Sequence, residues 1–297
     1  MPRAAIDIGS QSVLLTVLSD DGRVLHDEAR IVRLGTGLGD RGMFRPDRME
    51  AARAALVEYA ATATRLGVPA GEVRAAATSA ARRALNADTF FRRLQDETGL
   101  KVTVISGEEE ARLTWAGALH DLALPDGPVL VIDLGGGSTE LVLGERHHIH
   151  TRVSLELGAV RLTESFPGLL QSDPRGVSRL REHVDAVLSA ISLPMRPRTA
   201  LGVAGTATTL AAMDAGLSDY DPSVVHGYTL TRLALRRWID ALLEADTDQR
   251  RALAAVDPER ADYLLAGTVV LDRVLEVASR QSMKVSARGL RFGLLED

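Results

Sequence analysis

Two stretches of this chain, far apart in the sequence, share one pattern. They are residues 6–12 (IDIGSQS) and 132–138 (IDLGGGS). Aspartate, glycine and the final serine stand in the same order in both, and apolar segments flank each copy. A Leu-Gly pair follows each copy, at residues 34–35 and 157–158. Chance similarity between two hairpins is the alternative, but the matched context favours two related domains that each begin with a strand, a turn and a strand.

Length and composition agree with two domains and exclude several kinds of protein. The chain has 297 residues, of which 45% are hydrophobic and 25% charged, as in ordinary globular proteins. The absence of cysteine excludes disulfides, thiolate metal sites and a cysteine nucleophile. A formal net charge of −5 does not suit a nucleic-acid binder, so local features must hold any anion.

The beginning of the chain and its apolar runs indicate where the protein works. The first residues contain no apolar signal-peptide core, and no apolar run approaches the roughly 20 residues that span a bilayer. We therefore expect a cytoplasmic protein without a membrane partner.

The alternation of strand and helix patterns predicts an α/β fold. In the first domain, residues 1–125, we expect three antiparallel strands within residues 4–32. Further elements are predicted at 46–66 (helix), 73–77 (strand), 88–98 (helix), 102–105 (strand) and 108–119 (helix).

The second domain, residues 126–287, repeats this alternation. Strands are predicted at 129–132, 139–144, 150–155, 199–204 and 285–286, and helices at 160–166, 174–191, 208–215, 231–244 and 258–280. A closing helix within residues 288–297 can join the first domain.

The duplicated hairpin turns have the residues that phosphate binding needs. Glycines let the backbone approach an anion closely, with N–H groups directed at phosphate oxygens. Asp7 and Asp133 can hold a hard divalent cation such as Mg²⁺. A strand follows the second turn, so it is neither a dinucleotide fingerprint nor a P-loop, which both need a helix there. An ordinary tight turn is the alternative. The phosphate-binding residues predicted from the two turns are Gly9, Ser10, Gln11, Ser12, Gly135, Gly136, Gly137 and Ser138.

A third glycine turn, at residues 205–209 (GTATT), ends a predicted strand and begins a helix. The free N–H groups of a helix N-terminus attract anions, so Gly205 and Thr206 are candidate phosphate ligands. The alternative is an ordinary threonine N-cap with a glycine bend.

Charged residues near these turns have two possible interpretations. The acidic run at residues 108–110 begins a helix, where Ser106 can act as its cap and acids favour the helix dipole. A hydrolase also needs a carboxylate that activates water, but helix physics does not select one of the three. Arg82 can form a fork to phosphate oxygens or lie on a solvated helix face.

The histidines give little support for a metal site of their own. His147 and His148 of the tract at residues 147–150 would point to opposite faces of a strand. His120-Asp121 is a single pair, and His226 is interpreted as structural.

Six motifs together resemble the exopolyphosphatase and guanosine pentaphosphate phosphohydrolase (Ppx/GppA) family, in family order. They lie at residues 5–10 (AIDIGS), 77–82 (ATSAAR), 104–113 (VISGEEEARL), 132–141 (IDLGGGSTEL), 205–210 (GTATTL) and 288–291 (RGLR). The resemblance implies two duplicated actin-like (ribonuclease-H-like) domains of the sugar kinase, Hsp70 and actin superfamily, with an active site in an interdomain cleft.

The same resemblance implies roles for individual residues. Glu110 matches the family's catalytic base, while Asp133 and Glu140 match residues that act in metal binding and catalysis. Arg82 matches a phosphate ligand. Mg²⁺, or Mn²⁺ in its place, is the implied cofactor, and a homodimer is the implied assembly.

Two features depart from the family pattern. Gln11 stands where the family usually has asparagine, which lengthens the reach of the amide. The chain also stops soon after the second domain, as in a minimal two-domain member without the further helical domains of longer relatives.

The function that the resemblance implies is hydrolysis of the terminal phosphoanhydride of inorganic polyphosphate. Hydrolysis of the 5′ γ-phosphate of guanosine pentaphosphate is the alternative within the family, because both substrates end in a phosphoanhydride. A kinase of the same superfamily and a non-catalytic sensor of (p)ppGpp-type nucleotides or polyphosphate are the other classes, and the acidic motifs argue against both.

Overall fold

The computed structural model of the chain describes residues 1–297 apart from 39–41, 146–147, 172 and 297. Its contacts divide the chain into two compact units. Unit 1 comprises Met1–Gly117 and Leu290–Asp297, and unit 2 comprises Ala118–Gly289. The sequence predicts two independently folding domains, residues 1–125 and 126–287. The division into compact units does not test independent folding, so those limits stay a prediction.

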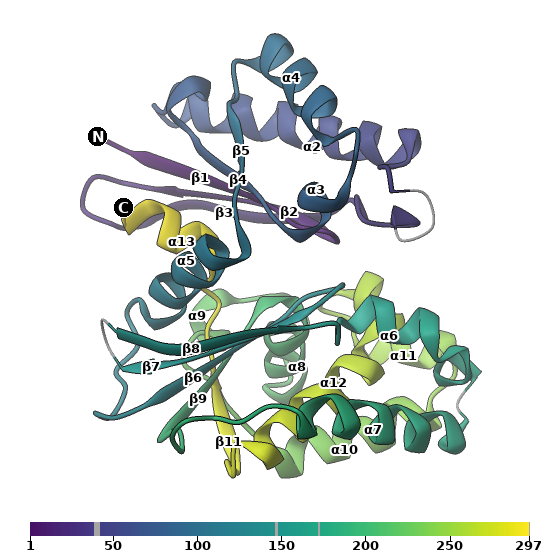
Figure 1. Ribbon diagram of the computed structural model, residues 1–297. Helices are drawn as coiled ribbons and strands as arrows, with labels where there is room; N and C mark the ends of the chain where they lie inside the picture. Colours follow the sequence, from purple (N-terminus) through teal and green to yellow (C-terminus); the bar gives the residue numbers. More distant parts are fainter. Residues whose placement is uncertain (39–41, 146–147, 172, 297) are drawn as a thin grey trace. The chain divides into compact units, whose positions relative to one another are not determined.

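The sheet of unit 1 has the strand order β3-β2-β1-β4-β5 (Figure 1). Its first three strands run antiparallel and follow each other in the chain, whereas β4 and β5 continue the sheet parallel to β1. The strands are β1 (Arg3–Ile8), β2 (Ser12–Leu18), β3 (Val24–Ile31), β4 (Arg74–Ala77) and β5 (Val102–Val104).

Helices cover both faces of this sheet. Alternate residues of β1, such as Ile6 and Ile8, pack with α2 (Pro46–Arg65) and α4 (Ala87–Thr98) in the main core. On the opposite face, Ala5 and Ala76 pack against α13 (Leu290–Glu296) and α5 (Gly107–Leu119). The short helix α3 (Ser79–Arg83) follows β4.

The sheet of unit 2 repeats the plan of unit 1. Its order is β10-β11-β9-β6-β7-β8, so five neighbouring strands reproduce the order of unit 1 and β10 extends the edge. The strands are β6 (Val129–Leu134), β7 (Thr139–Glu145), β8 (His148–Leu155), β9 (Thr199–Val203), β10 (Thr229–Thr231) and β11 (Ser282–Val285). This order is that of the actin-like (ribonuclease-H-like) domain, so the predicted duplicated α/β fold is confirmed.

The helices of unit 2 pack with its sheet around one large apolar core. They are α6 (Ala159–Ser165), α7 (Pro174–Ser189), α8 (Ala204–Asp214), α9 (Pro222–Val225), α10 (Arg232–Glu244), α11 (Thr247–Leu253) and α12 (Ala261–Val277). The core joins leucines and isoleucines of β6 and β7 to the long apolar helix α12.

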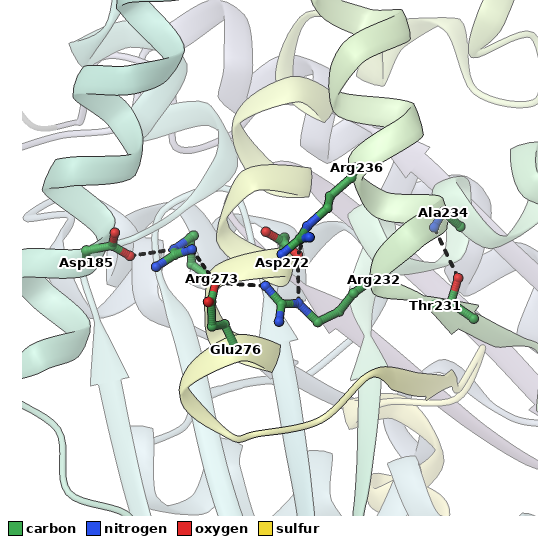
Figure 2. Close-up of polar contacts among 8 residues, drawn as sticks. All are labelled: Asp185, Thr231, Arg232, Ala234, Arg236, Asp272, Arg273 and Glu276. Atoms are coloured by element: carbon green, nitrogen blue, oxygen red, sulfur yellow. Dashed lines mark hydrogen bonds and ion pairs between the residues drawn. The ribbon is translucent and has the colours of Figure 1, made fainter.

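An ion-pair network with one buried pair at its centre ties three of these helices together (Figure 2). Arg232 of α10 donates from Nε to Asp272 Oδ1 at 2.8 Å and from Nη2 to Glu276 Oε2 at 2.8 Å. Arg273 of α12 donates to Asp185 of α7 at 2.6 Å. Because Arg232 and Asp272 are nearly inaccessible to solvent, each needs the other to offset the loss of hydration.

Some elements differ from those expected. Helix α8 begins at Ala204 rather than near residue 208, because Ala204 adopts a left-handed φ of 65° that turns the strand directly into the helix. The helix expected over 258–280 is a short 3-10 turn, Pro258–Arg260, followed by α12. The short elements α9, α11 and β10 lie outside the predicted elements, since so few residues show no clear periodicity.

In the part of the chain that the structure describes, every helix is too short or too polar to cross a membrane.

Candidate active site

The β1–β2 turn of unit 1 is closed by its own backbone. Gly9 N donates to Ser12 O at 2.9 Å, and the N–H groups of Val32 and Arg33 both donate to Gln11 O. Gly35 N donates to Ser10 O at 2.8 Å, and a Cβ on Gly35 would lie 3.0 Å from the Ser10 Cβ. Residues 32–35 therefore support the turn and keep its backbone in one conformation.

The β6–β7 turn of unit 2 is built in the same way. Gly135 N donates to Ser138 O at 3.0 Å, as Gly9 does to Ser12. Gly158 packs so closely that a Cβ there would lie 2.3 Å from Gly136 O. The repeated Leu-Gly pair thus has a physical reason, because the segment after each hairpin lies against the turn where a side chain has little or no room.

Asp133 and Glu140 are direct neighbours across the β6–β7 ladder. Directly opposed residues in an antiparallel pair project from the same face, so the two carboxylates share one side of the hairpin. Ser154 of β8 donates from Oγ to Glu140 Oε1 at 2.8 Å and orients that carboxylate. In unit 1 the residue opposite Asp7 is Leu14, so only the hairpin of unit 2 carries a carboxylate pair.

Asp7, the penultimate residue of β1, has one buried carboxylate oxygen. Among the residues that the structure describes, no donor reaches its Oδ1 atom. Burial and then the negative charge of Glu110 raise the pKa of Asp7 to about 7, against the opposing positive charge of Arg291. A buried carboxylate oxygen without a donor, next to a second carboxylate, is a suitable ligand for a hard cation.

The three glutamates at the start of α5 have different surroundings. Ser106 Oγ accepts from Glu109 N at 3.1 Å, so the predicted serine cap is present. Glu108 is exposed, and Glu109 forms an ion pair with Arg112 at 2.9 Å one turn along the helix. The Glu110 carboxylate is largely buried and accepts from Arg82 Nη1 at 2.7 Å.

Arg82 is held on two sides. Its Nη1 also donates to Ile105 O at 2.9 Å, which joins α3 to the end of β5. The structure therefore places Arg82 on the exposed side of helix α3, with its guanidinium against Glu110. An arginine in this position orients a carboxylate and keeps further N–H donors for an anion.

The N-terminus of α8 lies beside the second hairpin. Strand β9 runs parallel to β6, with Val203 opposite Asp133, so Gly205 follows the same edge of the sheet as Gly135. Val203 occupies the N-cap position and has no polar side chain, so Thr206 and Thr208 are not caps. The alternative of an ordinary threonine N-cap is wrong for this helix.

Arg260 is a candidate residue that the sequence did not reveal. A Cβ on Gly205 would lie 2.0 Å from Arg260 Nη1, so the guanidinium lies directly over the glycine. Asp257 forms an ion pair with Arg260 Nε from the preceding turn. In the sequence, Arg260 is a single arginine in a polar turn, about 55 residues after Gly205. Only the fold brings its side chain to Gly205.

The predicted residues thus form two groups, one in each unit. Unit 1 brings together Asp7, Glu110 and Arg82 near the turn at residues 9–12, and unit 2 brings together Asp133, Glu140, Ser138 and the glycines of two turns. His147 lies outside the described residues. His120 and Asp121 lie near the partly buried His226, away from the two hairpin turns in the sequence.

Known proteins resemble this chain over almost its whole length. An exopolyphosphatase 2 of Mycobacterium tuberculosis is 38% identical over 288 residues, which cover 91% of this chain and 89% of that protein. The crystal structure of the Aquifex aeolicus member of the Ppx/GppA family shares 37% identity, with a TM-score of 0.83 over 99% of this chain and 96% of the other.

A second solved structure, of an exopolyphosphatase from Cytophaga hutchinsonii, has a TM-score of 0.88 and 26% identity. It covers 100% of this chain and 97% of the other. The model of the Ppx/GppA phosphatase family matches residues 17–297. The repeated hairpins, the acidic start of α5 and these likenesses agree, and the chain belongs to the Ppx/GppA phosphatase family.

Proposed function

We propose that this protein is an exopolyphosphatase, which hydrolyses the terminal phosphoanhydride of inorganic polyphosphate and releases phosphate. The observation that carries the proposal is the cross-strand pair of Asp133 and Glu140 beside a turn of three glycines. Such a turn suits phosphate oxygens, and such a pair suits a divalent cation that accompanies them. The exopolyphosphatases that resemble this chain support the same reaction.

Mg²⁺, with Mn²⁺ as a substitute, fits the residues present. Asp133 and Glu140 would hold it in unit 2, and the buried Oδ1 of Asp7, which no described donor reaches, suits a cation in unit 1. When bound, the ion neutralises charge on the phosphoryl oxygens.

The chain's own residues would do the rest of the chemistry. Backbone N–H groups of the glycine turns and of α8 would bind phosphoryl oxygens, with Gly9, Ser10, Gly135, Gly136, Gly137, Gly205 and Thr206 as the proposed ligands. Arg82 would orient the Glu110 carboxylate, with which it pairs at 2.7 Å. A water oxygen attacks the terminal phosphorus, the bridging P–O bond breaks, and Glu110 accepts the water proton. The shortened chain leaves with the bridging oxygen.

Guanosine pentaphosphate remains the alternative substrate, since it also ends in a phosphoanhydride and the catalytic residues contact only that end. Gln11 belongs to the proposed substrate contacts, and its buried Nε2 has no acceptor among the described residues, so it can donate to a bound group. A homodimer and a cytoplasmic location remain predictions.

The test compares phosphate release from purified protein with polyphosphate and with guanosine pentaphosphate. We expect release from polyphosphate that needs Mg²⁺ or Mn²⁺, and a loss of most of this activity in Asp133→Asn, which keeps the shape but removes the charge. Asp126→Asn, a change of the same kind in the loop before β6, is the control and should behave as wild type. Full activity in excess chelator would contradict the metal assignment, and turnover of the nucleotide alone would contradict the substrate.

A further inference from the structure

The last helix of the chain returns to unit 1 after the chain has passed through unit 2. Helix α13 begins at Leu290, and residues 290–297 belong to unit 1. Leu290 packs with Ala76 of β4, Ile105 and Leu113 of α5. Phe292 and Leu295 pack with Ala5 of β1 and Leu18 of β2. One short helix therefore touches both the strand that carries Asp7 and the helix that carries Glu110.

A buried arginine fixes this helix to the sheet. Arg291 is buried, and its Nη2 donates to Asp27 Oδ2 at 3.2 Å. The other oxygen of Asp27 accepts from the fully buried Thr16 Oγ1 at 2.7 Å. Strand register places Ala5, Thr16 and Asp27 side by side across β1, β2 and β3. Arg291 is thus anchored on the face of the sheet to which Asp7 belongs.

A glycine sets the distance between α13 and α5. A Cβ on Gly293 would lie 2.0 Å from Leu113 O and 2.7 Å from Leu113 C. These are backbone atoms of α5, so no rotation of a side chain relieves the clash. Any larger residue at position 293 must push α5 away from α13, and Glu110 lies on the first turn of α5, one turn before Leu113.

We propose that α13 is a positioning element of the active site, with Gly293 as its positioning residue and Arg291 as its anchor. The helix holds the Glu110 carboxylate at a set distance from Asp7 by bridging β1 and α5. This inference rests on the proposed function of Glu110 as the base. It assigns a role to Leu290 and Arg291, the last two residues of the motif at residues 288–291, which the proposed chemistry does not otherwise use.

The test is Gly293→Ala, which adds one methyl group at the contact. We expect kcat with polyphosphate to fall at least about tenfold while KM changes little, because a small displacement of a catalytic group weakens the transition state more than substrate binding. Gly289→Ala is the matched control. A Cβ there meets no atom within 4 Å, and this variant should behave as wild type.

A double-mutant cycle separates positioning from a general structural defect. If Gly293→Ala acts by moving Glu110, it should cost little further kcat when added to Glu110→Gln. A tenfold further loss in that background, or unchanged kcat in a folded Gly293→Ala, would overturn the proposal. Near wild-type activity of Glu110→Gln alone would instead overturn the proposed function. If Gly293→Ala does not fold, Asp27→Asn, which loosens Arg291, must show the same non-additive loss.

Discussion

The surroundings of Glu110 distinguish it from its two neighbours at the scale of single residues. Consecutive side chains on a helix project about 100° apart, so three glutamates in a row cannot face one site. Glu108 is exposed and Glu109 pairs with Arg112, whereas Glu110 is largely buried against Arg82. We predict that Glu110→Gln lowers kcat by about two orders of magnitude or more with KM little changed, since general-base catalysis contributes about 10²–10⁴-fold.

Steady-state phosphate release over a range of polyphosphate concentrations measures this effect. Glu108→Gln is the control, and because Glu108 is exposed at the first turn of α5 we expect kcat to stay near the wild-type value. If Glu109→Gln is inactive while Glu110→Gln is near wild type, Glu109 is the base and the assignment to Glu110 is wrong.

At the scale of elements, the ion pairs between α10 and α12 in unit 2 combine burial with charge (Figure 2). The side chains of Arg232 and Asp272 are 9% and 5% exposed. We predict that Asp272→Asn lowers the free energy of unfolding by about 2–4 kcal/mol, less than the loss of an isolated buried pair because Glu276 still contacts Arg232.

Urea denaturation followed by circular dichroism measures the loss. Asp248→Asn is the matched control, because Asp248 is 93% exposed in its pair with Arg251 and an exposed pair contributes about 0–1 kcal/mol. Equal losses of unfolding free energy in the two variants would show that the buried α10–α12 pair contributes no more to stability than an exposed pair.

At the scale of the whole molecule, unit 2 is one continuous segment, whereas unit 1 needs both ends of the chain. We predict that residues 118–289 expressed alone unfold cooperatively in urea. Residues 1–117 alone should not, because without α13 the apolar contacts of Ala5 and Leu18 with Phe292 and Leu295 are lost. Joining residues 288–297 to residues 1–117 through a flexible linker should restore the transition. A cooperative transition of residues 1–117 without this segment would contradict the division.

The sequence by itself determined the features that depend on nearby residues. The duplicated Asp-Gly hairpins, most longer helices and strands, and the Ser106 cap all follow from short-range patterns and backbone preferences. The repeated Leu-Gly pair could be seen in the sequence, although its reason, contact with the turn, could not. The resemblance of the motifs supplied the family and candidate residues.

Only the tertiary structure decided which of these residues meet. It placed Arg82 on Glu110 rather than on Glu108 or Glu109, and Arg260 over Gly205. It also returned α13 to the sheet of the first unit. Each of these contacts joins residues far apart in the chain, and their geometry depends on how whole elements pack. Local periodicity carries no information about such packing, because many partners satisfy the same pattern of apolar and polar residues.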